Sequence, residues 1–258
     1  MQKIDHLSPT QIALFEMCGL AYKYTYIDKI PKPPPPPQVV KGSLIHYIIE
    51  RKILDKDRFN IDSVIEAFKS QPNSQIMMLN KEDMDQVILS VTKAMDVINT
   101  NNWMPEDRIE LVEQELIYYI DGIKIIVKPD IIAENTVYDH KIINVNSLFR
   151  YEKINYPDQL IIGAMATNKP TAAYNLFIEM KDGSFVFKRI KFDHIRLRYK
   201  RLITKIRRIW EMINNNMFYP VDKDGDNKWK CTPKHCDFYS TCEFGAKDEL
   251  PSVEYVPF

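Results

Sequence analysis

The chain has little glycine and no net charge, and each absence excludes a class of protein. Its seven glycines lie far apart: the closest pairs, Gly163–Gly183 and Gly225–Gly245, are separated by 20 residues. This spacing excludes both the glycine-rich phosphate loop of nucleotide-driven motors and the dinucleotide fingerprint of NAD enzymes. The 35 basic residues balance 35 acidic ones, so nucleic acid could be bound only through a local patch.

Long apolar runs are also lacking. Residues 1–10 contain no apolar segment of the kind that starts a secretion signal, and no stretch approaches about 18 uninterrupted apolar residues. We therefore expect a cytoplasmic protein with no membrane partner. Its lysine-, isoleucine- and asparagine-rich composition is typical of an AT-rich bacterial or viral genome, which leaves open a virus-infected host cell. Four cysteines in such a chain favour a metal site or free thiols over disulfides.

Periodic apolar residues predict helices in the first hundred residues. Ser8 can cap a helix that continues to Cys18, with Gln11 completing a capping box. The proline-rich run over 31–37 predicts a stiff spacer rather than a ligand for a proline-binding domain. Further helices are expected at 42–54, 61–70 and 82–99.

The pattern changes to strands after residue 105. Asp121-Gly122 is a hairpin turn signal between two alternating apolar segments. We expect strands at 109–120, 123–133, 136–143, 173–180 and 184–190, and helices at 157–168 and 193–215. This order predicts one mixed α/β domain without internal repeats.

Two carboxylates and a lysine are expected to converge in the sheet. Side chains at i and i+2 of a strand share a face, so Asp139 and Lys141 should project together while His140 points away. If the strand that holds Asp130 pairs with this one, its carboxylate lies near Asp139. Such a group suits hydrolysis with Mg²⁺ or Mn²⁺, the lysine orienting water and stabilising developing charge. A surface ion pair is the alternative for D-x-K alone.

These residues resemble the signature of the PD-(D/E)XK nuclease superfamily, Pro129-Asp130 followed by Asp139-x-Lys141. Gly42-Ser43-Leu44-Ile45-His46 resembles the G-x-x-x-H motif of its RecB-like branch. Gln159 stands where that branch has Q-x-x-x-Y, although Gly163 replaces the tyrosine. The segment from Leu7 to Tyr24 is similar to the branch's N-terminal helix, so the resemblance covers nearly the whole chain.

The resemblance implies a restriction-endonuclease-like core and a metal-dependent DNA exonuclease that acts on single-stranded ends with two metal ions. The implied metal ligands are His46, Asp130, Asp139 and the main-chain oxygen of His140; the implied catalytic residues are Lys141 and Gln159. A nitrogen ligand tilts the preference toward Mn²⁺. The expected segments of a single domain over 1–258 are an N-terminal helix (1–30), a helical insertion (55–105), a catalytic sheet core (106–192), a basic helix (193–216) and a cysteine-rich segment (217–258).

The cysteines lie at the two ends of the chain. Cys231, Cys236 and Cys242 give C-x₄-C-x₅-C, and Cys18 lies far upstream. Spacing alone does not distinguish a four-cysteine zinc site from an iron–sulfur cluster. The resemblance to AddB-type and CRISPR-associated RecB-like nucleases implies a structural [4Fe–4S] cluster that joins the chain ends, although the first gap there is often shorter.

The expected helix over 193–215 carries an unusual excess of basic residues. Its apolar stripe should face the core, and its basic remainder is either a solvated face or a phosphate-contacting surface. The candidate DNA contacts are Arg201, Lys205 and Arg208. By analogy, the helices between 55 and 100 would form an arch that admits single strands.

Two other functions remain open from the sequence. One is a CRISPR-adaptation-type nuclease that trims DNA in a complex with an integrase, because the motifs are shared. The other is a catalytically inactive iron–sulfur DNA-binding module, for which Gly163 is the only support.

Overall fold

The computed structural model describes residues 4–72, 74–154, 157–221 and 228–245. Two compact units divide the chain. The sheet unit comprises Pro34–Tyr119 and Ile125–Ile203, and the terminal unit comprises Met1–Pro33, Ile120–Lys124 and Thr204–Phe258. The single domain over 1–258 stays a prediction, and of its cysteine-rich segment residues 222–227 and 246–258 lie outside the described residues.

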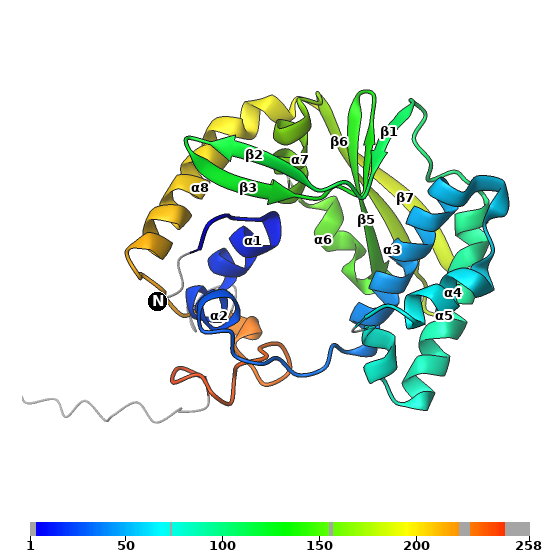
Figure 1. Ribbon diagram of the computed structural model, residues 1–258, viewed down its shortest axis with the longest axis horizontal. Helices are drawn as coiled ribbons and strands as arrows, with labels where there is room; N and C mark the ends of the chain where they lie inside the picture. The colour runs from blue at the N-terminus through cyan, green and yellow to red at the C-terminus, as the bar shows by residue number, and fades with distance from the viewer. Residues whose placement is uncertain (1–3, 73, 155–156, 222–227, 246–258) are drawn as a thin grey trace, which may run out of the picture. The chain divides into compact units, whose positions relative to one another are not determined.

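A five-stranded mixed sheet forms the centre of the sheet unit, in the order β1-β4-β5-β6-β7 (Figure 1). The strands are β1 (Ile109–Val112), β4 (Ile131–Ala133), β5 (Thr136–Asn144), β6 (Thr171–Glu179) and β7 (Phe185–Phe192). Only β5 and β6 pair in parallel; the other three pairings are antiparallel. A parallel pair needs a crossover, which here contains α6 (Leu148–Glu152) and α7 (Asp158–Thr167).

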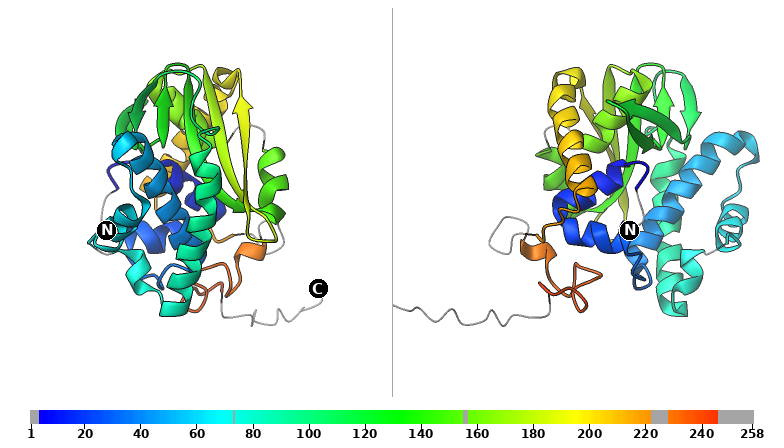
Figure 2. Two further views of the ribbon diagram at one scale, coloured as in Figure 1. Left: turned by 90° about the vertical axis from the view of Figure 1, so that its right-hand side faces the viewer. Right: turned by 60° about the vertical axis from the view of Figure 1, so that its left-hand side comes forward.

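Helices cover both faces of this sheet. Tyr138, Ala173 and Phe177 belong to one core cluster with α3 (Pro37–Asp55), α4 (Ile61–Lys69) and α5 (Lys81–Asn99), which lie together on one side (Figure 2). The alternate residues of β5 and β6, including Val137 and Ala172, pack with Leu160 and Ala164 of α7. Successive side chains of a strand point to opposite faces, so consecutive residues of β5 pack against the helices on opposite sides of the sheet.

The helix that carries His46 is fixed to the sheet by an ion pair between a buried lysine and a half-buried glutamate. The Nζ atom of Lys41 on α3 donates to Oε2 of Glu179, at the end of β6, at 2.5 Å. Ser90 of α5 donates to the other carboxylate oxygen of Glu179 at 2.9 Å. The helix begins at Pro37, where the missing N–H has no cost, rather than at residue 42 as expected. The expected helices at 61–70 and 82–99 are confirmed as α4 and α5.

The long strands expected at 109–120 and 123–133 are wrong, because each is interrupted. Glu113 takes a left-handed φ of 50° and ends β1, and Pro129 cannot donate to a ladder, so the second segment breaks before β4. The two strands between these breaks, β2 (Leu116–Ile120) and β3 (Ile123–Val127), form a separate two-stranded hairpin. Its turn has positive φ at Asp121 and Gly122, as the dipeptide predicts.

In the terminal unit, the predicted first helix is confirmed as α1 (Pro9–Met17), followed by α2 (Gly19–Tyr22). Ser8 caps α1 by accepting from the Gln11 N–H at 3.2 Å. The return bond of a capping box is not observed: the Gln11 side chain instead contacts His6 and accepts from the Tyr22 hydroxyl at 3.4 Å.

The basic helix α8 (Tyr199–Asn214) starts later than expected, because Ile195–Arg198 form a 3₁₀ turn. Arg201 and Arg208 are exposed, whereas Lys205 is half-buried and paired with Glu16 at 2.8 Å. The apolar stripe expected on this helix is half-buried at Tyr199 and buried at its other residues, which are Ile195, Leu202, Ile206, Ile209 and Ile213.

Across the described residues, none of the helices combines the length and apolarity needed for a membrane span.

Candidate active site

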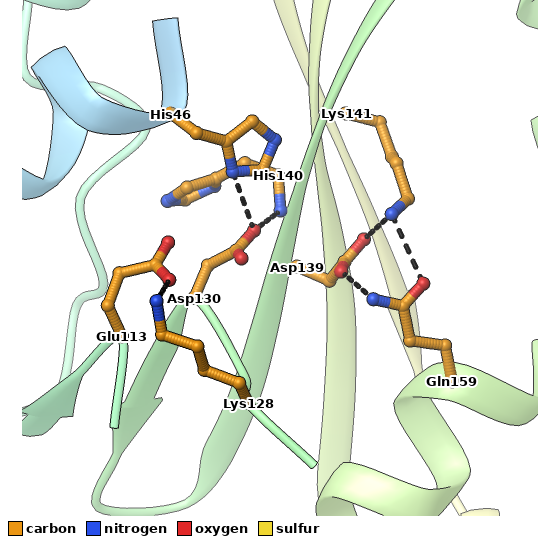
Figure 3. A network of polar contacts seen from close by, with 8 residues as sticks. All are labelled: His46, Glu113, Lys128, Asp130, Asp139, His140, Lys141 and Gln159. Atoms are coloured by element: carbon orange, nitrogen blue, oxygen red, sulfur yellow. Dashed lines mark hydrogen bonds and ion pairs between the residues drawn. The ribbon is translucent and has the colours of Figure 1, made fainter. Parts of the chain in front are cut away.

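Asp130 is held against the central strand. It is the residue before β4 rather than part of a strand, and β4 pairs with β5 so that Ile131 lies opposite Tyr138. This register lets the Asp130 Oδ2 atom accept a hydrogen bond from the backbone N–H of His140 (Figure 3). The Pro-Asp turn therefore reaches the level of Asp139 on β5, as the spacing predicts.

Asp139, Lys141 and Gln159 form a closed polar triangle. The Lys141 Nζ atom lies 2.6 Å from Asp139 Oδ2 and donates to Gln159 Oε1 at 3.2 Å. The Gln159 amide, from the first turn of α7, donates to Asp139 Oδ1 at 2.5 Å. The Lys141 ammonium also lies 5.9 Å from the Tyr174 ring centroid. The predicted i, i+2 arrangement and the inclusion of Gln159 are both observed (Figure 3).

A second group of side chains gathers around Asp130. The His46 Nδ1 atom lies 3.5 Å from Asp130 Oδ2. Glu113, which no sequence motif singles out, joins them: one ligating atom of each of His46, Glu113 and Asp130 lies within 4.8 Å of the others. The Glu113 carboxylate is paired with Lys128 Nζ at 2.7 Å. The only available sequence signal was a charged residue interrupting an alternating strand pattern.

The two aspartates have opposite electrostatic surroundings. Burial alone would raise the pKa of Asp130, but His46 and the bonded amide of His140 lower that pKa well below its ordinary value. Burial raises the pKa of Asp139 to about 6, against the opposing effect of Lys141. Both are hard oxygen ligands, and a divalent cation beside them would favour their ionised forms. The residues present therefore fit a Mg²⁺ or Mn²⁺ site.

The lysine and the two histidines of the site also differ in the direction of their pKa shifts. Burial alone would lower the pKa values of His46 and Lys141, but the neighbouring carboxylates Asp130 and Asp139 raise both. Lys141 is therefore a cation at neutral pH. His140 is only 1% exposed, its ring nitrogens have no hydrogen-bond partner among the described residues, and burial lowers its pKa to about 4. As predicted, its side chain points away from Lys141 and packs against Trp103 and Phe177.

Gly163, the departure from the Q-x-x-x-Y pattern, has a packing explanation. A Cβ at this position would lie 3.2 Å from Cγ1 of Val137 on β5 and 3.6 Å from Cγ of Pro129. Helix α7 therefore approaches both the central strand and the residue before Asp130. A tyrosine side chain at position 163, in this arrangement, would overpack the interface.

In the terminal unit, all four cysteines line one cavity of about 70 Å³. Burial raises the pKa of the Cys236 thiol, and the other three thiols raise it further by their proximity. The Cys18 Sγ atom caps α2, accepting from the Ala21 N–H at 3.5 Å. Four thiols that line one cavity fit either of the predicted groups, a zinc ion or an iron–sulfur cluster.

The pKa values of His46 and His140 should be shifted in opposite directions from the ordinary value. In the metal-free protein we expect His46 to lose its proton above the ordinary pKa of about 6.5, and His140 to stay neutral until pH falls toward 4. Between these values the unfolded chain binds a proton that buried His140 does not, so this group lowers the free energy of unfolding as pH falls. Imidazole NMR titration, assigned with His140→Gln, measures both. Titration of His140 near pH 6.5 would contradict this arrangement.

Comparison with known proteins places this geometry in a family. A model of the PD-(D/E)XK nuclease superfamily matches residues 6–243. No curated protein sequence shows a significant match. Among solved structures, a candidate exonuclease from Eubacterium rectale is similar with a TM-score of 0.58 and 11% identity, over 88% of this chain and 92% of that one. An alkaline exonuclease from Laribacter hongkongensis matches at a TM-score of 0.34 and 14% identity, over 67% and 88% of the two chains.

At this identity the first structural similarity shows the fold alone, and the second is too low to add to it. The expected mixed sheet flanked by helices is confirmed. The family model spans Pro129-Asp130 and Asp139-x-Lys141 together with His46 and Gln159. The chain belongs to the PD-(D/E)XK nuclease superfamily, whose members use divalent metals.

Proposed function

We propose that the chain is a metal-dependent DNA exonuclease of the RecB-like branch that hydrolyses single-stranded ends. The observation that carries the proposal is the convergence of two aspartates, a histidine and a protonated lysine in one unit, with Gln159 tying Asp139 to Lys141. The description of the Eubacterium rectale neighbour as a candidate exonuclease supports the proposal as analogy. An inactive binding module would have no need to keep this set together.

In this proposal His46, Asp130, Asp139 and the main-chain oxygen of His140 hold Mg²⁺ or Mn²⁺. Bound there, two such ions would activate the attacking water and stabilise the leaving oxygen. Lys141 acts as a fixed cation beside the developing negative charge, because its raised pKa keeps it protonated. Gln159 is a positioning residue: it accepts from Lys141 and donates to Asp139, which fixes both side chains.

The proposed DNA contacts are exposed basic residues of α8. Arg201 and Arg208 present their guanidinium groups to solvent, which suits contact with phosphates. Lys205 is the weaker candidate of the three, since Glu16 already neutralises it.

The catalytic assignment predicts loss of cleavage without loss of fold. With end-labelled single- and double-stranded DNA in Mn²⁺, we expect wild type to degrade the single strand progressively. Lys141→Ala should be slower by at least about 10²–10³-fold, because the charge-stabilising cation is missing, and Asp130→Ala should be inactive.

Lys191→Ala is the matched control, since that exposed lysine lies on β7 in the same sheet. It should cleave like wild type. Circular dichroism must show all variants folded. Activity retained in both Lys141→Ala and Asp130→Ala would falsify the assignment. A folded wild type that binds DNA tightly in Mn²⁺ without cutting it would replace the enzyme with a binding module.

We further propose that Cys18, Cys231, Cys236 and Cys242 bind a structural [4Fe–4S] cluster. All four thiols line one cavity, so their placement is compatible with a group that binds all of them. Four thiolates suit either zinc or an iron–sulfur cluster, and the resemblance to AddB-type and CRISPR-associated RecB-like nucleases favours the cluster.

The cluster proposal predicts iron and acid-labile sulfide in anaerobically purified protein. Cys236→Ser should lose most of both and unfold at lower temperature, since the group joins distant parts of the chain. Ser240→Ala, an exposed change in the same loop, should keep both. Zinc in place of iron would overturn the cluster and leave a zinc site.

A further inference from the structure

Tyr151 lies on α6, the short helix that follows β5 in the crossover to α7. Its ring packs with Leu148, three residues earlier on the same face of α6, against the core cluster that includes Tyr174. The helix is also tied to β7, because Lys188 Nζ donates to Glu152 at 2.5 Å. The half-buried Tyr151 side chain is therefore held at the sheet.

The Tyr174 ring brings Tyr151 close to the lysine of the site. Tyr174 lies on β6, opposite Asp139 of β5 in the parallel register. The Tyr151 ring meets the Tyr174 ring edge to face, with centroids 5.5 Å apart and planes at 83°. The Lys141 Nζ atom lies 5.9 Å from the centroid of the same Tyr174 ring. Tyr151 and the Asp139–Lys141 pair therefore border one aromatic ring.

The hydroxyl group of Tyr151 has no partner beside these charged groups. It makes no hydrogen bond within the part of the chain that the structure describes. Burial raises the pKa of Tyr151 above its ordinary value, and Lys141 and Asp139 are close enough to shift that pKa in opposite directions. The hydroxyl is therefore a neutral phenol at neutral pH, which can donate a hydrogen bond.

On α7, the polar positions next to the site are occupied or empty. Gln159 and residue 163 lie one turn apart and share a face of the helix, but residue 163 is glycine. The amide nitrogen of Gln159 already donates to Asp139 at 2.5 Å. Tyr151 of α6 thus offers a donor that a substrate can still use beside Lys141.

We propose that Tyr151 is a further catalytic residue, whose hydroxyl donates a hydrogen bond to a non-bridging oxygen of the phosphate that is cleaved. This inference rests on the proposed function and deepens it. Negative charge grows on the phosphate oxygens as water attacks, and a fixed donor beside Lys141 stabilises that charge. The edge-to-face contact with Tyr174 keeps the phenol in place.

The test is single-turnover cleavage of end-labelled single-stranded DNA in Mn²⁺ by the full-length protein. Tyr151→Phe keeps the ring and its contact with Tyr174, and removes only the hydroxyl. We expect its cleavage step to be about 10²-fold slower, because one donor to the transition state is missing. Its thermal unfolding temperature, its Kd for Mn²⁺ and its Kd for DNA in Ca²⁺ should equal those of wild type.

Tyr119→Phe is the matched control, since it removes the same hydroxyl from an exposed tyrosine on β2. It should cleave like wild type. Phosphorothioate DNA then locates the contact, because sulfur accepts a hydrogen bond more weakly than oxygen. In one of the two diastereomers at the cleaved linkage, sulfur should slow wild type more than it slows Tyr151→Phe.

Three results overturn the inference and leave the nuclease proposal standing, provided that Lys141→Ala is slowed. They are a wild-type cleavage rate in Tyr151→Phe, a loss explained wholly by weaker binding of DNA or Mn²⁺, and equal sulfur effects in both proteins. If wild type cleaves no DNA, the proposed function itself fails, and this inference fails with it.

Discussion

The hydrogen bond from the His140 N–H to the Asp130 carboxylate is the contact on which the site depends. It fastens the Pro-Asp turn to the central strand, so that the first aspartate is set by the register of the second. The Glu113 N–H then binds the Asp130 carbonyl, which places a third carboxylate by the same turn. Buried polar groups held in this way have few alternative arrangements, which is the pre-organisation that catalysis needs.

The side chains around β5 divide by face. Asp139 and Lys141 meet Gln159 of α7 on one side, where the carboxylate is costly to ionise and the lysine compensates. His46 of α3 meets Asp130 on the other, where the carboxylate is strongly ionised. A divalent cation between a readily ionised and a reluctantly ionised carboxylate would stabilise both charges, so metal binding and the burial of these groups are linked.

Much of this was readable from the sequence, because it depends on local periodicity. The i, i+2 spacing predicted that Asp139 and Lys141 share a face, and the apolar stripes predicted the helices that carry His46 and Gln159. Glu113 could not be found in this way: its position depends on a left-handed glutamate and on a partner in a later turn. The same long-range contact interrupts the strands expected at 109–120 and 123–133. The reason for Gly163 likewise lies in the close approach of α7 to Val137 and Pro129.

The central claim is that these residues hold a divalent cation. Anomalous X-ray scattering from crystals of the full-length protein soaked with Mn²⁺ tests it most directly. The account predicts a manganese peak in contact with His46 and Asp130. Well-ordered His46 and Asp130 side chains with no manganese between them, at a Mn²⁺ concentration that supports cleavage, would contradict it.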